Sequence, residues 1–300
     1  MIKILLSGLL LLFVTLPASA ALNVFACEPE WASLTQELGQ KKVNVFSATT
    51  AQQDPHRIQA RPSLIAKMRR ADLVVCTGAD LEIGWLPVLQ RRATNPKIQP
   101  GQPGYFEAAQ HVTLLDKPVR VDRAEGDVHA AGNPHIHLNP HNISRVAEAL
   151  AQTLISIDPQ NAPIYKQNKD DFLLRWQQAI AQWEQRAKPL RNLPVVTQHK
   201  TWTYLLDWLA MEEVAQLEPK PGLPPSTAYL SQIVTTLQQQ PAKAILVAPY
   251  QNPKASEWLH SRTAIPIVTL PYTVDTNAED KSLFGLFDSI VSELLAVSTP

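Results

Sequence analysis

Short apolar runs rich in β-branched residues alternate with amphipathic segments along most of the chain. This alternation is typical of parallel sheets covered by helices, and predicts an α/β fold. The predicted strands span residues 22–27, 42–48, 72–77, 112–115, 194–197, 244–248 and 265–270. Apolar residues at helical spacing predict helices over 64–71, 82–93, 204–210, 228–239 and 282–297.

One long interruption of this alternation, residues 142–190, shows no strand pattern and is predicted to be helical. Asp158-Pro159 divides it, because proline disfavours a helical residue before it but suits a first helical turn. Beyond that step, one apolar stripe contains Tyr165, Phe172, Leu173, Trp176, Ile180 and Trp183. A helix of about 28 residues would extend roughly 42 Å, long enough to span two lobes as a rigid element.

Residues 1–20 have the pattern of a secretory signal peptide, with Lys3 at the start, an apolar run, and Ala18-Ser19-Ala20 as a cleavage site. We expect cleavage after Ala20 and export, to the periplasm of a Gram-negative host. A lipid anchor on Cys27 is the alternative. The expected organisation is residues 1–20 as signal peptide, 21–158 as N-terminal lobe, 159–188 as linking helix and 189–300 as C-terminal lobe.

The charge balance argues against two classes of partner. Lysine and arginine together number 27, equal to the 27 acidic residues, and no basic run occurs. We therefore expect neither nucleic acid nor an anionic membrane surface as partner. The two cysteines, Cys27 and Cys76, either form a disulfide or remain buried thiols, since spacing alone does not fix their geometry.

Three histidines, His56, His135 and His199, each follow an extended apolar or proline-stiffened segment. Proline in Asp54-Pro55-His56 and in Asn133-Pro134-His135 restricts the backbone before each imidazole. His199 follows the strand predicted over 194–197. Because ligands gather beyond the carboxyl ends of parallel strands, the three imidazoles are candidates for one divalent-metal site.

Three further residues could take part in the metal site, and each has a second interpretation. His137 shares one face with His135 in an extended segment and is an alternate ligand or a partner of a ligand. His129 either collects metal or belongs to a solvated loop, and Glu82 either orients a histidine or is an acid favoured at a helix start. His111, His141 and His260 are interpreted as ordinary solvated or hydrogen-bonded side chains.

The motifs resemble those of a known family, the cluster-A solute-binding proteins of zinc and manganese ABC transporters. The resemblance covers essentially the whole mature chain. It rests on 54–56 with Arg61-Pro62-Ser63, 71–74 leading to 78–82 and Trp85-Leu86, 133–135 ending in Leu138-Asn139-Pro140, 158–161 before the long helix, and His199 with Tyr204-Leu205.

This resemblance implies two α/β lobes joined by a rigid helix, a metal held between them, and no catalysis. It implies His56, His135 and His199 as ligands, with an acidic fourth ligand from the second lobe. The chain departs from the family there: Asp275 is our candidate, and Glu218 or a water are the other options. The implied partner is an ABC permease in the inner membrane, with a metallochaperone as a second candidate, and the chain is expected to be a monomer.

Three imidazoles with one carboxylate favour Zn²⁺, and Mn²⁺ is the second candidate, each as bound cargo. Two other functions use the same residues. A metal-dependent hydrolase could use His135 and His137 as paired ligands with a metal-bound water, and a periplasmic chaperone could deliver metal to another protein. A closed eight-stranded barrel is not predicted, which disfavours the hydrolase.

Overall fold

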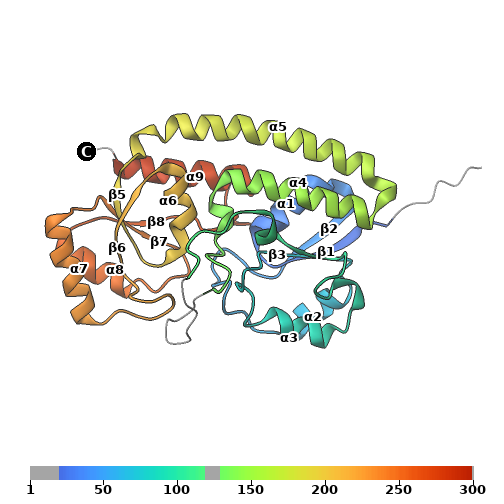
Figure 1. Cartoon of the computed structure of the whole chain (residues 1–300), viewed down its shortest axis with the longest axis horizontal. Coiled ribbons are helices and arrows are strands. Elements are labelled where there is room, and N and C mark those ends of the chain that lie inside the picture. The colour runs from blue at the N-terminus through green and yellow to red at the C-terminus, as the bar shows by residue number, and fades with distance from the viewer. Residues whose placement is uncertain (1–19, 119–128, 299–300) are drawn as a thin grey trace, which may run out of the picture.

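The computed structural model describes residues 20–118 and 129–298, and so leaves out almost all of the predicted signal peptide. Within these residues, two four-stranded parallel sheets lie side by side (Figure 1), which confirms the α/β fold. The N-terminal sheet has the order β2-β1-β3-β4, with β1 Leu22–Ala26, β2 Val43–Ser47, β3 Leu73–Cys76 and β4 Tyr105–Glu107. The C-terminal sheet has the order β6-β5-β7-β8, with β5 Pro194–Thr197, β6 Glu212–Gln216, β7 Ala244–Val247 and β8 Ile267–Thr269.

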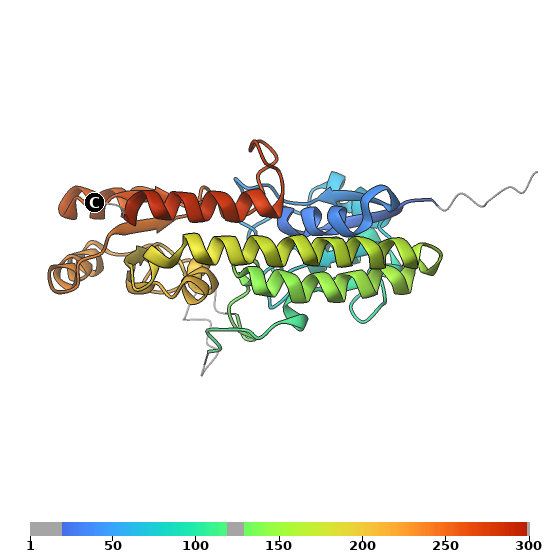
Figure 2. The same ribbon diagram turned by 90° about the horizontal axis from the view of Figure 1, so that it is seen from above.

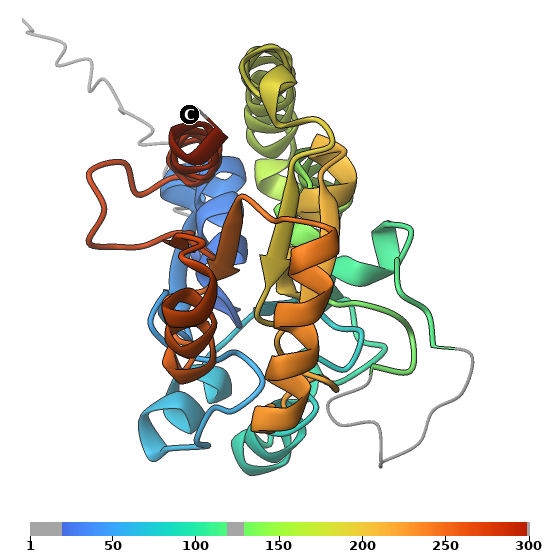
Figure 3. The ribbon, with the colours of Figure 1, turned by 90° about the vertical axis from the view of Figure 1, so that its left-hand side faces the viewer.

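Both sheets are covered on their two faces, which explains their short uninterrupted apolar runs. In the N-terminal sheet, Val24 and Val75 face one apolar cluster, and Phe25 and Val74 face another. The helices are α1 Pro29–Gly39, α2 Pro62–Arg69, α3 Leu86–Ala93, α4 Pro140–Ile157, α5 Ala162–Arg186, α6 Thr203–Leu209, α7 Thr227–Gln239, α8 Lys254–Thr263 and α9 Leu283–Ser298. Figure 3 shows α7 and α8 on the opposite side of the C-terminal lobe from α5 and α9.

The long helix predicted from the aromatic stripe is present as α5. It has 25 residues, hence a length of about 37 Å, and runs beside α4 and α9 over both lobes (Figure 2). Trp176 is fully buried at its centre, 5.5 Å between ring centroids from Phe287 of α9. Its indole Nε1 donates a hydrogen bond to the Pro140 carbonyl at 2.8 Å. One continuous apolar cluster therefore includes residues of both lobes.

One strand prediction was wrong, and two strands were missed. Residues 112–115 form no strand, and the fourth strand of the N-terminal sheet is β4, only three residues long. Strand β6 was missed because it is an edge strand whose Glu212 and Glu213 are exposed, so its sequence lacks a continuous apolar run. Helices α1 and α8 were also not predicted.

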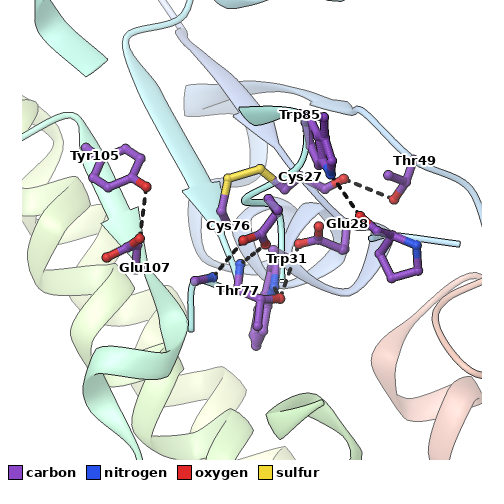
Figure 4. Close-up of a disulfide and its surroundings, with 12 residues drawn as sticks. Cys27, Glu28, Trp31, Thr49, Cys76, Thr77, Trp85, Tyr105 and Glu107 are labelled. Carbon is purple, nitrogen blue, oxygen red and sulfur yellow. Dashed lines mark hydrogen bonds between the residues drawn. A yellow bond between two sulfur atoms is a disulfide. The ribbon is translucent and has the colours of Figure 1, made fainter. Parts of the chain in front are cut away.

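Cys27 and Cys76 form a disulfide that joins the ends of β1 and β3 (Figure 4). Both residues are fully buried, so Cys27 offers no thiol for a lipid anchor in this structure. Glu82 follows β3, where its two carboxylate oxygens accept hydrogen bonds from the Thr77 amide at 2.8 Å and the Gly78 amide at 3.1 Å. Glu82 thus holds this turn, and the suggestion that it orients a histidine was wrong.

Glu28 and Glu82 form a buried pair of carboxyl groups beside the disulfide. Glu28 accepts a hydrogen bond from the Thr77 hydroxyl at 3.2 Å. Burial raises the pKa of Glu82 to about 7, and burial with the neighbouring charge of Glu82 raises the pKa of Glu28 well above its usual value. The folded pair therefore retains protons at pH values where the unfolded chain has lost them.

Trp176→Ala should lower the free energy of unfolding by about 3–5 kcal/mol, because it removes a large buried ring and leaves a cavity. Leu174→Ala, on the same helix but 60% exposed, should change it by less than about 1 kcal/mol. Urea denaturation of both variants measures the difference. Equal losses would show that Trp176 is not central to the shared core.

Glu82→Gln should remove a pH dependence of stability. A folded pKa of about 7 against an ordinary value of 4.5 means that rising pH destabilises the wild type across this interval. The stability of Glu82→Gln relative to wild type should therefore increase from pH 4.5 to 7, by at most about 3 kcal/mol, and then level off. Urea denaturation at several pH values measures this difference, with exposed Glu279→Gln as the control; a flat difference would contradict the elevated pKa.

Candidate metal centre

The structure brings His56, His135 and His199 together. His56 lies in the loop after β2, His199 lies two residues beyond β5, and His135 precedes the turn that leads into α4. Each ring offers a nitrogen, and these nitrogens lie within 4.8 Å of one another. Ring centroids are 5.5 Å apart for His56 and His135, and 5.6 Å apart for His135 and His199. Residues from both lobes thus meet at one point.

Asp54 fixes the orientation of His56. Its Oδ1 accepts a hydrogen bond from the His56 amide at 3.0 Å and lies 2.8 Å from His56 Nδ1. Although burial acts to raise it, the hydrogen bond and charge of His56 lower the pKa of Asp54 overall, so this carboxylate is ionised at neutral pH. The Trp85 indole donates a hydrogen bond to the Pro55 carbonyl at 2.8 Å and supports the same loop.

His199 has the same arrangement in the other lobe. Its Nδ1 lies 2.7 Å from Glu218 Oε2, and that oxygen also accepts a hydrogen bond from the Gly222 amide at 2.7 Å. A carboxylate at Nδ1 favours the proton on that nitrogen and leaves a lone pair on Nε2 that could bind a metal. Glu218, which we considered as a possible ligand, therefore contacts the histidine on its other ring nitrogen.

His135 is held by both lobes. Its amide donates a hydrogen bond to Asn133 Oδ1 at 2.9 Å, and its Nδ1 lies 3.2 Å from the Tyr272 hydroxyl. Burial, with the neighbouring His56 and His199 rings, lowers the pKa of His135 well below its usual value. The ring is therefore neutral near pH 7, the state that metal coordination requires.

His137 lies behind this cluster and not within it. It is fully buried, its Nε2 donates a hydrogen bond to the Tyr272 carbonyl at 2.9 Å, and its Nδ1 lies 3.3 Å from Glu30 Oε1. Glu30 in turn accepts a hydrogen bond from the Thr273 hydroxyl. His137 thus holds the 272–273 segment of the C-terminal lobe against α1.

The remaining two candidates are His129, whose ring lies close to that of His56, and Asp275, which lies apart from the imidazoles. His129 is half-buried, and its ring centroid lies 5.3 Å from that of His56. Asp275 lies outside the group of three imidazoles, and its Oδ1 accepts hydrogen bonds from the amide and side chain of Asn277. Asp127, two residues before His129, lies outside the described residues.

The cluster has the chemistry of a transition-metal site. Ideal tetrahedral Zn–N bonds of about 2.0–2.1 Å separate nitrogens by roughly 3.3 Å, so small side-chain movements would bring these three to one ion. His56 Nε2 is buried and has no hydrogen-bond partner within the described residues. A buried nitrogen lone pair without a donor is suited to a cation.

Sequence reasoning missed the side chains that orient the ligands. We interpreted the motif Asp54-Pro55-His56 only through its proline. The spacing of two residues between Asp54 and His56 was a usable signal, because it permits the observed hydrogen bond from the His56 amide to Asp54. Tyr272 and Glu30 carried no usable signal, since they lie 137 and 107 residues from the histidines that they contact. Only the assembled fold shows these contacts.

Comparisons with known proteins agree with this geometry. The family model "ZnuA: Zinc-uptake complex component A periplasmic" matches residues 24–297. The manganese ABC transporter substrate-binding lipoprotein scaA of Streptococcus gordonii is 27% identical over 52% of this chain, which spans only 48% of that protein. The metal ABC transporter substrate-binding lipoprotein FimA of Streptococcus parasanguinis is 24% identical over 85% of this chain and 81% of its own length.

The solved structures show the same fold. A crystal structure of ZnuA superimposes with a TM-score of 0.77 at 20% identity, covering 93% of this chain and all of that one. The family match and the shared fold together define the class as solute-binding proteins of metal ABC transporters. Within that class, the chain belongs to the zinc-uptake component A family, the substrate-binding components of zinc and manganese ABC transporters.

Asp54→Asn and Glu218→Gln should each weaken metal binding by about 10–100-fold, because the histidine loses the carboxylate that fixes its tautomer and orientation. Asp72→Asn is the matched control: Asp72 is half-buried, pairs with Lys97 at 2.8 Å, and is not part of the imidazole group. Competition titration with a chromophoric zinc chelator gives the three affinities. Unchanged affinity in both site variants would show that these carboxylates do not position the ligands.

Proposed function

We propose that this protein captures a divalent transition metal, Zn²⁺ first and Mn²⁺ second, in the periplasm and delivers it to an ABC permease. The single observation that carries the proposal is the convergence of His56, His135 and His199 from both lobes. Family membership supports transport as the purpose of this site. The sequence pattern of residues 1–20 supports export, with cleavage after Ala20. Within the described residues, no helix combines the length and the apolar character that a membrane span needs.

The donor set supports zinc over manganese. The three converging groups are imidazoles, while the nearest carboxylates, Asp54 and Glu218, contact the Nδ1 atoms of His56 and His199. Nitrogen donors suit zinc, whereas harder Mn²⁺ favours carboxylate oxygens. The related scaA is named for manganese and the family for zinc, so the names of relatives do not separate the two metals.

The fourth ligand is a separate proposal. Asp275 remains our candidate from sequence, although its Oδ1 here accepts the hydrogen bonds of Asn277. A movement of the segment after Tyr272 would be needed to bring this carboxylate to the imidazoles. The proposal of metal capture does not depend on Asp275, because three imidazoles already form a chelating set.

The geometry and the family give the hydrolase interpretation no support. A paired site would need His137 beside His135 at the metal, but His137 instead bonds the Tyr272 carbonyl. The family consists of binding components and not of enzymes. A metal chaperone would use the same three imidazoles, and a binding assay with the purified permease would distinguish it from a transport component.

Anaerobic titration should give one zinc per chain, with affinity exceeding that for manganese. His56→Ala, His135→Ala and His199→Ala should each weaken zinc binding by more than about 100-fold, because each removes a direct ligand. His260→Ala is the control, since His260 is exposed and bonds the Ile265 carbonyl.

Asp275→Ala tests the fourth ligand in the same titration. A loss comparable with that of the histidine variants would establish Asp275 as a ligand, and normal binding would exclude it. Normal zinc binding in the three histidine variants would overturn the proposed function itself.

A further inference from the structure

His129 lies beside the imidazole cluster, but the proposed function does not use it. Its ring centroid is 5.3 Å from that of His56, closer than the 5.5 Å between His56 and His135. Its Nε2 is a buried atom. Burial is the main cause of the lowered pKa of His135, and His129 is among the neighbouring rings that add to it. His129 is therefore close to two of the three proposed ligands.

A tight turn brings His129 back toward the cluster. The Gly132 amide donates a hydrogen bond to the His129 carbonyl at 3.1 Å and closes this turn. Gly132 has a φ of +124°, and a Cβ here would lie 2.7 Å from the Leu115 carbonyl oxygen, so the turn requires glycine. The Asn133 amide donates to the same Leu115 carbonyl at 2.8 Å. The turn is thus anchored two residues before His135.

His129 shares a cavity with two of the proposed ligands. The cavity has a volume of about 380 Å³, and His129, His135 and His199 all line it. His129 is outside the group of three histidines whose nitrogens lie within 4.8 Å of one another, so its ring has to move to join them. Because the shared space is a cavity and not packed side chains, this movement does not disturb the core.

The spacing of the rings matches a site built of four imidazoles. With Zn–N bonds of about 2.0–2.1 Å and each centroid about 1.1 Å behind its nitrogen, tetrahedral ligands have centroids roughly 5.2 Å apart. The separation of His56 and His129 is 5.3 Å. The pairs among His56, His135 and His199 are 5.5, 5.6 and 5.9 Å apart. His129 thus lies as near to His56 as a fellow ligand would.

We infer that His129 is the fourth ligand, so that the metal is held by four imidazoles. The inference rests on the proposed function, since it takes His56, His135 and His199 as the other ligands. It assigns to His129 the position for which the sequence offered Asp275, an acid that here bonds to Asn277.

The charges around the cluster suit a neutral fourth donor. The carboxylates of Asp54 and Glu218 already lie against the Nδ1 atoms of His56 and His199. A further carboxylate, bound directly to the metal, is therefore not needed to offset the charge of a divalent ion. A donor set made only of nitrogen also favours Zn²⁺ over the harder Mn²⁺.

X-ray absorption at the zinc edge tests the number of imidazoles through their multiple-scattering signal. Zinc-loaded wild type should show about four, and His129→Ala about three with an oxygen donor from water. Zinc affinity of His129→Ala should fall by at least about ten-fold. His111→Ala is the matched control, because the exposed His111 ring stacks on Phe106 and is not part of the cluster.

His129→Asp tests the same position through metal preference. A carboxylate oxygen in place of a nitrogen should lower the ratio of zinc to manganese affinity by at least about ten-fold. The ratio of two metals on one variant is not changed by a general loss of folded protein. His111→Asp should leave the ratio as in wild type.

The outcomes separate this inference from the proposed function. Three imidazoles in zinc-loaded wild type, or an unchanged metal ratio in His129→Asp, would each overturn the assignment of His129. The proposed metal capture would stand in both cases. Failure of wild type to bind zinc would overturn both proposals.

Discussion

The metal centre depends on hydrogen bonds that cross between the two lobes and fix ligands far apart in sequence. Asn133, just before His135, donates through Nδ2 to the Lys200 carbonyl at 2.7 Å, and its own carbonyl accepts from the Tyr204 hydroxyl at 2.8 Å. His137 Nε2 donates a further hydrogen bond between the lobes, to the Tyr272 carbonyl. Without these contacts, the imidazole of the first lobe would have no fixed distance to that of the second.

A different side chain orients each of the three imidazole rings. Two carboxylates and a phenol contact the Nδ1 atoms of the three histidines and restrict the rotation of each ring. The carboxylates also favour a proton on Nδ1 of His56 and His199. The two carboxylates also place negative charge beside the imidazole cluster. Such a site combines nitrogen donors, which favour zinc, with local charge compensation.

The shared core limits how the lobes can move. α5 packs against α4 and α9, and one apolar cluster continues through both lobes. Wide separation of the lobes would expose the aromatic rings around Trp176 to water, at a large free-energy cost. Wide hinge opening of the two lobes is therefore disfavoured.

The sequence predicted the parts with local signals. Apolar alternation located six of the eight described strands, and the aromatic stripe located α5, because burial against neighbours imposes a period on the chain. Edge strand β6 and short β4 escaped this reasoning, since exposed edges do not require apolar runs. The motifs containing Pro55 and Pro134 identified His56 and His135 as candidates, because proline restricts the backbone only of its immediate neighbours and so leaves a local signal in the sequence.

What the sequence by itself determined was the α/β class, the long helix and the three histidines that converge. Only the tertiary structure decided which atoms meet: that Asp54, Glu218 and Tyr272 orient the rings, that His137 joins the lobes and stays away from the centre, and that Asp275 lies apart from it. The physical reason is that backbone preferences and amphipathic periods are properties of neighbouring residues. A coordination site is a property of distances between segments, which exist only after the core has packed.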